Sequence, residues 1–576
     1  MHLKFVSFCF IILISGNFQE SSYGGHLAGS DIGYMQSGVC VRYIYAGLFT
    51  SYLSPYFSEM PAPVYFSKSV LNEDRNAYFS CRQNRGRGVV SVPKKINKVL
   101  VANRGVPAVR VMHTCIDRKI QTTAVYSTPD RLAHHVAVAD SAVHIGDAPP
   151  GESYLNMDKI IEAALKSRAD AVHPGWGFLA ENDEFAKRVL DAGLTWIGPE
   201  PGVIRDMGDK IKAKEIVEKV NVPTIPGISM VNTEEDIIRW LKEKDVAYPI
   251  IIKAAAGGGG KGMVKVESEA ELTRALAQVR SEAQKSFGNN KVLVEKYIER
   301  GRHIEVQIVA DKFGNVVHLY ERECTLQRRN QKIIEEAPSP SLSEDLRQEI
   351  CGKAVALMKQ IGYSTAGTVE FLFDSATQKY YFLEVNTRLQ VEHGITELIT
   401  GLDIVGIMLD VSMGKKLPFV QNDIRPNRWA MEARLNAEDP RTFSPSFGRI
   451  SRLHEPHGPG VRISSGVYEG ADIPSYYDSL IMLVMSAGAD RADAIRVMDR
   501  SLSRNLRVEG VKTLAPLLLS IIRHPSFIAG EFSTRFIEEN MRDLVATFVE
   551  ADHEDEALKV ARFVAEISAL GPQAWM

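Results

Sequence analysis

The chain has 576 residues, enough for three or four domains, and its 45% hydrophobic and 8% aromatic content is ordinary for a globular protein. With 68 basic and 71 acidic residues its net charge is −3, so no global field favours nucleic acid or an anionic membrane surface. The six cysteines show no CxxC pair and no zinc-like spacing, and we expect reduced thiols. Local site chemistry must therefore carry the function, without a nucleic-acid partner.

Residues 1–93 form an amino-terminal extension. The apolar run 5–14 follows Lys4 and resembles the core of a signal peptide, but it is too short to span a bilayer. The following residues are rich in Ser, Tyr and Gly and lack helical or strand periodicity. We expect a targeting extension, or sequence outside the working protein, poorly ordered in either case and without a stable membrane span.

Residues 94–208 alternate between apolar strands and helical patterns. A buried strand at 96–102 is followed by a glycine turn and a helix that continues to Arg118, and the alternation repeats up to the strand TWIG at 195–198. This order predicts a doubly wound parallel sheet. Its glycine turns, ANRG and HPGWGF, follow strands at the edge where such sheets bind ligands.

A run of four glycines, Gly257 to Gly260, separates two strands that each carry a lysine, and Lys253 ends the first of them. Consecutive glycines cost backbone entropy, and close approach of backbone N–H groups to phosphate explains them. The loop joins strand to strand, so it is not a Walker A loop. A floppy linker is the alternative; we predict a mobile lid over a nucleotide. Upstream, Thr233 is expected to cap a helix.

Two neighbouring strands, 366–374 and 379–386, predict a hairpin that places Glu370 beside Glu384. Strict alternation would turn Tyr381, Leu383 and Val385 to a core. The opposite face would carry Glu384, Asn386 and Arg388, with Gln390 and Glu392 following in the same parity. Two carboxylates and an amide oxygen suit Mg²⁺ or Mn²⁺ held together with phosphates. A solvated strand face is the alternative interpretation.

The segments before and after this hairpin complete the pattern. The strands 303–311 and 316–323 should pair across a KFGN turn, which puts His303 on the sheet, and QRRNQK at 327–332 supplies cations. Beyond Arg425 a strand-rich region carries Glu432 and Arg434 on one strand face, and a helix begins after Asp490. Residues 541–576 predict an amphipathic helical tail.

Taken together, these motifs resemble the biotin carboxylase family of the ATP-grasp superfamily, over roughly residues 95–539. The motifs are VLVANRG, HPGWGFLAEN, IIKAAAGGGGKGM, EKYIERGRHIEVQ, QRRNQKIIEEAPSP, FLEVNTRLQVEH, ARLNAEDP and YYDSLI. The resemblance implies an α/β domain (94–208), an α+β ATP-grasp domain (209–424) and a β-rich carboxyl-terminal domain (425–540). It implies the reaction of ATP, bicarbonate and biotin to ADP, phosphate and carboxybiotin, through carboxyphosphate.

The resemblance also implies roles for individual residues. ATP would be bound by Lys210, Lys253, Gly257, Gly258, Gly259, Gly260, Glu295, Lys296, Ile298, His303, Gln327, Asn330 and Lys332. The metal ligands would be Glu370, Glu384 and Asn386, with Arg388, Gln390 and Val391 on bicarbonate. The catalytic group would be Arg388, Lys332, Glu392 as the base that deprotonates bicarbonate, and Arg434, which binds biotin and stabilises its enolate.

Four positions depart from the family pattern: Asn330 replaces His, Trp176 replaces Tyr, Val106 replaces Glu and Gly394 replaces Pro. Asn can still hydrogen-bond a ribose, and none of the four removes a metal ligand, the base or an arginine. We therefore expect activity. The alternatives are another ATP-grasp ligase, such as a carbamoyl-phosphate or D-alanine type, or a catalytically silent nucleotide-binding scaffold.

No AMKM-type biotinylation sequence occurs in the chain. We therefore expect a stand-alone subunit that acts with a separate biotin carboxyl carrier protein and a carboxyltransferase. The resemblance implies a homodimer, and the final acceptor (acetyl-CoA, propionyl-CoA, another acyl-CoA or pyruvate) stays open. We expect a cytoplasmic protein, or one in a plastid or mitochondrion if the extension is a targeting segment.

Overall fold

The structure is a computed structural model that describes residues 94–229, 231–255, 262–547 and 561. The predicted extension and most of the predicted helical tail lie outside these residues. The described cysteines, Cys115, Cys324 and Cys351, are free and buried. In the described ranges no helix is both long and apolar enough to cross a membrane.

The amino-terminal region is a five-stranded parallel sheet in the order β3-β2-β1-β4-β5. Its strands are β1 (Lys98–Val101), β2 (Gln121–Ser127), β3 (Ser141–Gly146), β4 (Ala171–His173) and β5 (Thr195–Trp196). Its helices are α1 (Gly105–Asp117), α2 (His134–Val138), α3 (Met157–Lys166) and α4 (Asp183–Asp191). Val99 packs with α1 on one face, and Leu100 packs with α3 and α4 on the other. The doubly wound prediction is confirmed; the edge strand β3, half exposed, was not predicted.

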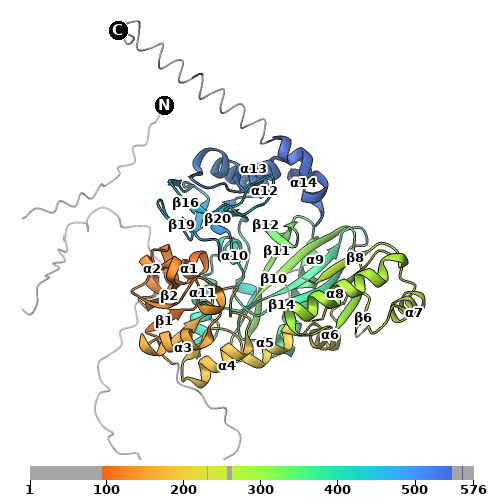
Figure 1. Ribbon diagram of the computed structural model, residues 1–576, viewed down its shortest axis with the longest axis horizontal. Helices are drawn as coiled ribbons and strands as arrows, with labels where there is room; N and C mark the ends of the chain where they lie inside the picture. Colours follow the sequence, from red (N-terminus) through yellow and green to blue (C-terminus); the bar gives the residue numbers. More distant parts are fainter. Residues whose placement is uncertain (1–93, 230, 256–261, 548–560, 562–576) are drawn as a thin grey trace, which may run out of the picture. The chain divides into compact units, whose positions relative to one another are not determined.

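A smaller antiparallel sheet in the order β6-β9-β7-β8 forms the lobe at the right of Figure 1. Its elements are β6 (Gly227–Ser229), α7 (Glu234–Lys244), β7 (Ile250–Ala254), β8 (Met263–Val266), α8 (Leu272–Phe287) and β9 (Val292–Lys296). Thr233 caps α7 as predicted, in a capping box with Asp236. The tetraglycine Gly257 to Gly260 lies outside the described residues, so the lid stays a prediction.

The largest sheet has eight antiparallel strands in the order β14-β13-β10-β11-β12-β15-β20-β18. Their bounds are β10 (Gly301–Ala310), β11 (Val316–Arg328), β12 (Gln331–Ala337), β13 (Thr365–Asp374), β14 (Lys379–Asn386), β15 (Trp429–Asn436), β18 (Val461–Ser465) and β20 (Leu480–Gly488). Helix α9 (Glu344–Gln360) packs on β10 and β11. β12 pairs with β15, so the sheet continues across the boundary that we predicted between residues 424 and 425.

The alternation predicted for β14 is wrong in detail. The register runs Glu370 to Glu384 and then Phe371 to Phe382, so a bulge falls at Leu383. The bulge shifts the parity, and Tyr380 and Phe382 share the core with Val385 while Tyr381 and Leu383 are only partly buried. The strand ends at Asn386, so Gln390 and Glu392 do not continue it.

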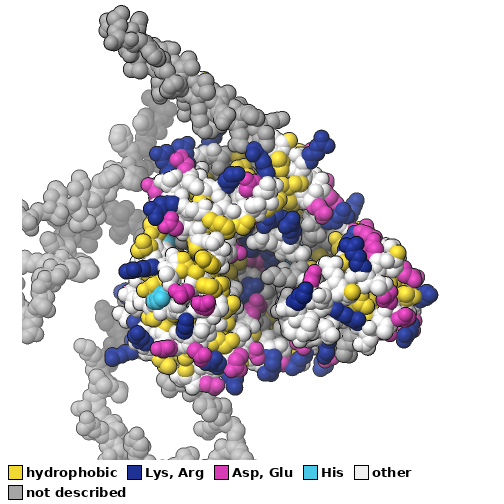
Figure 2. Space-filling view, in the orientation of Figure 1, with side chains coloured by type: hydrophobic (Ala, Val, Ile, Leu, Met, Phe, Trp, Pro, Cys, Tyr) yellow, Lys and Arg dark blue, Asp and Glu magenta, His cyan; other side chains and the backbone are white. Residues whose placement is uncertain are grey.

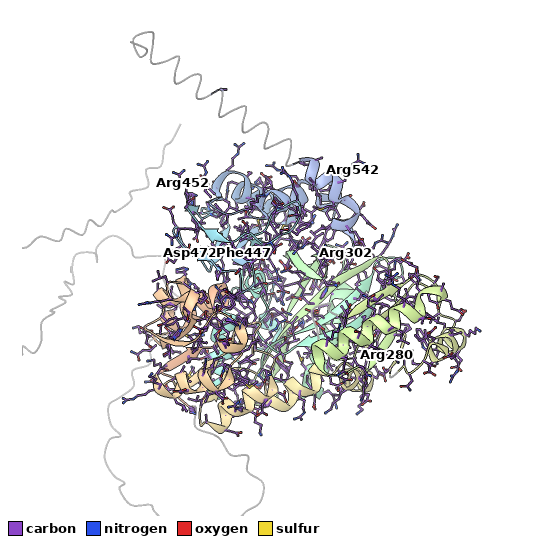
Figure 3. All side chains as sticks on the ribbon, viewed as in Figure 1. Arg280, Arg302, Phe447, Arg452, Asp472 and Arg542 are labelled. Carbon is purple, nitrogen blue, oxygen red and sulfur yellow. The ribbon has the colours of Figure 1, made fainter. Side chains whose placement is uncertain are left out.

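The remaining elements surround this sheet. They are α5 (Pro201–Gly208), α6 (Lys210–Lys219), α10 (His393–Thr400), α11 (Ile404–Ser412), α12 (Arg491–Arg500), α13 (Ala515–Arg523), α14 (Pro525–Ala529) and the short pairs β16 (Gly448–Arg449) with β19 (Asp472–Ile473) and β17 (Arg452–His454) with β21 (Arg507–Glu509). Helix α12 begins after Asp490 as predicted, and the Asp490 side chain caps it. Arg302 of β10 joins the sheet to the carboxyl-terminal helices: it donates to the carbonyl of Gly530 at 2.8 Å and lies over the Phe532 ring (Figure 3).

Candidate active site

Lys332 on β12 lies at the centre of a buried cluster of three carboxylates. Its Nζ is 2.5 Å from Glu305 Oε2, 2.9 Å from Glu370 Oε1 and 2.7 Å from Glu392 Oε1. Burial disfavours the ammonium, but the three carboxylates outweigh burial and raise the pKa of Lys332 well above its usual range. Lys332 is therefore a fixed positive charge. Figure 2 shows acidic and basic side chains gathered in a recess of the molecule.

The predicted pairing of Glu370 with Glu384 is confirmed by the register of β13 and β14. Asn386 donates its amide N–H to Glu370 Oε1 at 2.8 Å, and His303 Nε2 lies 2.9 Å from Glu370 Oε2. Burial raises the pKa of Glu384, and the charge of Glu370 adds to this rise. Burial also opposes ionisation of Glu370, but Lys332 and His303 prevail and hold its pKa well below the usual range.

These residues fit a hard divalent cation. Glu370 and Glu384 present oxygen atoms from neighbouring strands, and a cation between them would relieve the repulsion that raises the pKa of Glu384. The role of Glu370, Glu384 and Asn386 as metal ligands stays a prediction.

Arg388 follows β14 and is held on three sides. It donates from Nη2 to Asn386 Oδ1 (3.0 Å), from Nη1 to Gln390 Oε1 (2.8 Å) and from Nε to Glu181 Oε2 (2.9 Å). Val391 is partly buried beside this group. Glu181 precedes α4 in the motif HPGWGFLAEN, and we did not single it out from the sequence. Asn386 and Gln390 both donate to Glu370 Oε1, so they connect the Arg388 guanidinium to the carboxylate cluster.

Glu392 lies between two cations. It is the N-cap residue of α10. Its Oε2 accepts a hydrogen bond from Arg434 Nη2 at 2.9 Å, and its Oε1 accepts one from Lys332 Nζ. Burial opposes ionisation, but Lys332 and Arg434 hold the pKa of Glu392 well below its usual range. Arg434 Nε also donates to Glu335 Oε1 at 2.6 Å, a contact that we did not predict. Glu392 is thus an ionised carboxylate at neutral pH.

Two of the lysines predicted for the nucleotide, Lys253 and Lys210, interact with Glu295, whereas Lys332 lies in the carboxylate cluster. Lys253 Nζ and Lys214 Nζ each lie 2.7 Å from Glu295, and Lys214 was not predicted. Lys210 begins α6, where burial lowers its pKa although Glu384 opposes this shift. Lys296, which ends β9, is exposed, and Ile298 is buried. Their binding of ATP stays a prediction.

His303, Gln327 and Asn330 differ in their surroundings. Gln327 Nε2 lies 2.8 Å from His303 Nδ1, so these two side chains form one unit with Glu370. Asn330 is exposed in the turn between β11 and β12, where Arg329 and Asn330 have φ of 48° and 66°. Asn tolerates this left-handed backbone well, which gives a local reason for Asn at this position. Its contact with a nucleotide stays a prediction.

Two of the departures from the family pattern pack locally. Trp176 is buried, its carbonyl accepts from Asn103 at 2.8 Å, and its ring lies 5.9 Å from that of His393. A side chain at Gly394 would collide with the sulfur of Met485, so glycine suits its neighbour on β20.

An ion-pair network behind the site supports α10. Glu397 accepts from Arg110 at 2.7 Å and from Arg462 at 2.6 Å, and its side chain is 4% exposed. Burial opposes ionisation, yet Arg110, His393 and Arg462 lower the pKa of Glu397 to about 2. Removing one partner of a buried ion pair costs about 3–5 kcal/mol, which is the loss of unfolding free energy that we expect for Glu397→Gln at pH 7.

The pH dependence follows from the same pKa. The pKa of Glu397 is about 2 in the folded protein and ordinarily 4.5. Its contribution to the free energy of unfolding is therefore full above pH 4.5 and falls as the pH drops toward 2. Urea unfolding at pH 7 and between pH 5 and 3 measures it, and the difference from Glu397→Gln should shrink on acidification. Glu344→Gln, at a pair whose Glu is 66% exposed, serves as control. Equal losses in the two variants would contradict this account.

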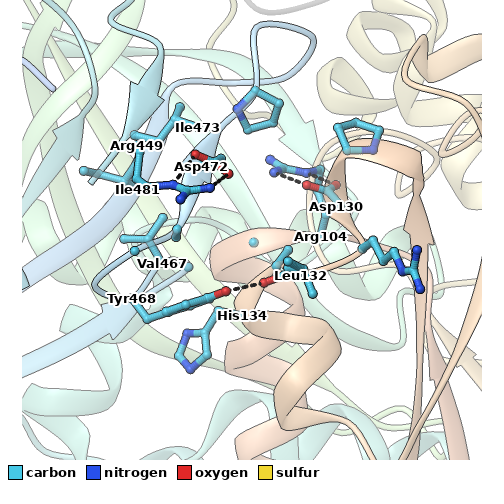
Figure 4. A pocket seen from close by; sticks show the side chains of 18 of the residues that line it. Arg104, Asp130, Leu132, His134, Arg449, Val467, Tyr468, Asp472, Ile473 and Ile481 are labelled. Atoms are coloured by element: carbon cyan, nitrogen blue, oxygen red, sulfur yellow. Dashed lines mark hydrogen bonds and ion pairs between the residues drawn. The ribbon is translucent and has the colours of Figure 1, made fainter. Parts of the chain in front are cut away.

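A separate cavity of about 230 Å³ lies between the 128–134 loop and the 466–474 segment (Figure 4). Two ion pairs line it, Arg104 with Asp130 and Arg449 with Asp472, and Tyr468 donates to the carbonyl of Leu132. None of the predicted site residues lines this cavity. The charges of Arg104, Asp130, Arg449 and Asp472 are thus used in these two ion pairs, and we assign the cavity no ligand.

Comparison with known families covers most of the described chain. Residues 95–204 match the model of the biotin carboxylase N-terminal domain, residues 209–420 the ATP-binding domain of the carbamoyl-phosphate synthase L chain, and residues 432–539 the biotin carboxylase C-terminal domain. The middle match defines the class, an enzyme with this ATP-binding domain. The matches on both sides favour a biotin carboxylase over the other ATP-grasp ligases considered.

Comparison with individual proteins supports the same family. The chain is 48% identical over 447 residues to a biotin carboxylase of Nostoc sp., covering 77% of this chain and 99% of that protein. It is 48% identical over 450 residues to the mitochondrial propionyl-CoA carboxylase alpha chain of Mus musculus, covering 77% of this chain and 62% of that protein. The biotin carboxylase domain dimer of Hydrogenobacter thermophilus 2-oxoglutarate carboxylase, in complex with MgADP, ADP and bicarbonate, matches with a TM-score of 0.75 and 43% identity, covering 78% and 98% of the two chains. The chain belongs to the biotin carboxylase family.

Proposed function

We propose that the protein catalyses the ATP-dependent carboxylation of biotin by bicarbonate, with the biotin attached to a separate carrier protein. The observation that carries this proposal is the position of Glu392, an ionised buried carboxylate fixed between Lys332 and Arg434. Arg388 and Gln390 join the same cluster through Asn386 and Glu370. A base, two guanidinium groups and an ammonium thus meet beside a carboxylate pair suited to a divalent cation.

Each group has a role in this chemistry. Bicarbonate is a weak nucleophile until it loses its proton; the planar guanidinium of Arg388 would hold its oxygens while Glu392 accepts that proton. Lys332 would neutralise charge on the transferred phosphoryl group, since phosphoryl transfer depends mainly on positioning and electrostatics. Magnesium or manganese, held by Glu370, Glu384 and Asn386, would supply further neutralisation of phosphate charge when bound. Arg434 would stabilise the biotin enolate beside Glu392.

The proposed partners are a biotin carboxyl carrier protein, a carboxyltransferase subunit and a second copy of this chain. The dimer of the Hydrogenobacter domain supports the last of these. In this proposal the carboxyltransferase selects the final acceptor. We retain the cytoplasm as the proposed compartment, supported by the Nostoc relative, with a mitochondrion or plastid as the alternative; the amino terminus of the mature protein distinguishes them.

The test uses the purified full chain with ATP, Mg²⁺, free biotin and radiolabelled bicarbonate. We expect ATP cleavage that requires bicarbonate and rises with biotin, together with acid-labile label on biotin. ATP cleavage that instead requires an amine or an amino acid would contradict the proposal in favour of another ATP-grasp ligase. Nucleotide binding without cleavage in metal-supplied protein would contradict it in favour of a silent scaffold.

A further inference from the structure

Arg434 is held by a second carboxylate besides the base. Glu335 on β12 lies directly opposite Glu432 on β15, and Arg434 follows two residues later on the same strand face. Glu335 and Glu432 are both fully buried. Arg434 Nε donates to Glu335 Oε1 at 2.6 Å, and Arg434 Nη2 donates to Glu392 Oε2 at 2.9 Å. The guanidinium is therefore stretched between two carboxylates that accept from different nitrogens.

The Glu335 and Glu432 pair holds fewer hydrogen bonds than two buried carboxylates need. Among the described residues, Glu335 Oε2 and both carboxylate oxygens of Glu432 have no hydrogen-bond partner. Side chains opposite one another on antiparallel strands are close neighbours, so two negative charges would repel strongly in this buried position. The pair therefore retains a proton at neutral pH.

The charges around the pair place that proton on Glu432. Burial and then the charge of Glu335 raise the pKa of Glu432 well above its usual range, although Arg434 and Arg322 oppose this. The pKa of Glu335 is raised to about 7, mainly by burial. Arg434 and Lys332 oppose this rise, while Glu392 and Glu305 add to it. Above about pH 7, Glu335 is thus the charged member that faces Arg434.

We infer that Glu335, backed by Glu432, is a positioning residue that keeps the guanidinium of Arg434 turned toward biotin instead of folded onto the base. The inference rests on the proposed function. Without the Glu335 carboxylate the Nε donor is released, and the guanidinium can turn to meet Glu392 through two parallel hydrogen bonds, a geometry that Arg favours. Such a pair removes Arg434 from biotin and makes Glu392 a weaker base.

The test compares Glu335→Gln with Glu336→Gln in the full-length protein. Glu336 is the next residue on β12, is also buried, and pairs with Arg491 of α12 at 2.7 Å on the opposite strand face. For Glu335→Gln we expect kcat/KM for biotin to fall at least tenfold more than bicarbonate-dependent ATP cleavage measured without biotin. For Glu336→Gln we expect the parent's ratio of these two rates, with a lower melting temperature.

The pH profile is a second readout, which a purely structural role would not change. In the parent, kcat/KM for biotin should rise as the pH increases through about 7, because Glu335 then ionises and engages Arg434. Glu335→Gln should lack that rise. Should this variant fail to fold, Glu335→Asp keeps the charge but withdraws it by one methylene, and the ratio should change in the same direction.

An unchanged ratio in the folded Glu335 variant, or a pH rise that persists in it, would overturn the inference. Absence of bicarbonate-dependent ATP cleavage in the parent protein would instead overturn the proposed function. The two failures are therefore distinguishable.

Discussion

Replacing Glu392 by Gln should lower turnover by about 10²- to 10⁴-fold, the usual contribution of a general base. Gln keeps the size of the side chain but cannot accept the proton of bicarbonate. The carboxylate it replaces is fully buried and ionised, fixed by Lys332 at 2.7 Å and Arg434 at 2.9 Å. ATP binding should persist, because Lys253, which is assigned to the nucleotide, pairs with Glu295 and not with Glu392. Steady-state kinetics and nucleotide titration measure the two effects.

The matched control for this variant is Glu321→Gln. Glu321 is also fully buried and accepts a hydrogen bond from Arg347 at 2.7 Å, but no catalytic or binding role was predicted for it. Its replacement should cost stability and leave kcat close to that of the parent. If Glu392→Gln and the parent turn over at the same rate, the base is wrongly assigned.

Replacing Lys332 by Met should impair both folding and catalysis. Its ammonium is the shared partner of Glu305, Glu370 and Glu392, so its loss leaves buried carboxylates without compensation. Removing one partner of a buried ion pair costs about 3–5 kcal/mol, and the carboxylates would then take up protons. Because a protonated Glu392 cannot act as a base, we expect kcat to fall by at least about 10²-fold.

Thermal unfolding and kcat are measured on Lys332→Met beside Lys312→Met. Lys312 pairs with Glu200 at 3.3 Å in a half-exposed position, where an ion pair contributes only about 0–1 kcal/mol. The control should therefore behave like the parent. A Lys332→Met protein as stable and active as its control would refute the central place of this ammonium.

The sequence predicted the framework of the site well because its strongest signals are local. The alternation of strands and helices predicted the parallel sheet, the Thr233 cap was correct, and the hairpin brought Glu370 opposite Glu384. The bulge at Leu383 could not be predicted, since both parities present apolar side chains in KYYFLEVN and packing against α9 decides between them.

The site residues that the sequence did not reveal were missed for one physical reason. Glu305, Glu335 and Lys214 each acquire meaning through a partner distant in sequence: Lys332, Arg434 and Glu295, respectively. Read alone, a glutamate on a strand or a lysine on a helix indicates a solvated face. The continuity of the eight-stranded sheet from β12 to β15 likewise depends on long-range pairing, which no local pattern encodes.

The most direct test of the central claim follows oxygen from bicarbonate labelled with ¹⁸O. If Glu392, Arg388 and Lys332 activate bicarbonate for attack on ATP, the phosphate released during biotin carboxylation must carry an oxygen atom that came from bicarbonate. We predict one labelled oxygen per phosphate, detected by mass spectrometry, in step with carboxybiotin formation. Phosphate whose new oxygen comes only from water would contradict the account.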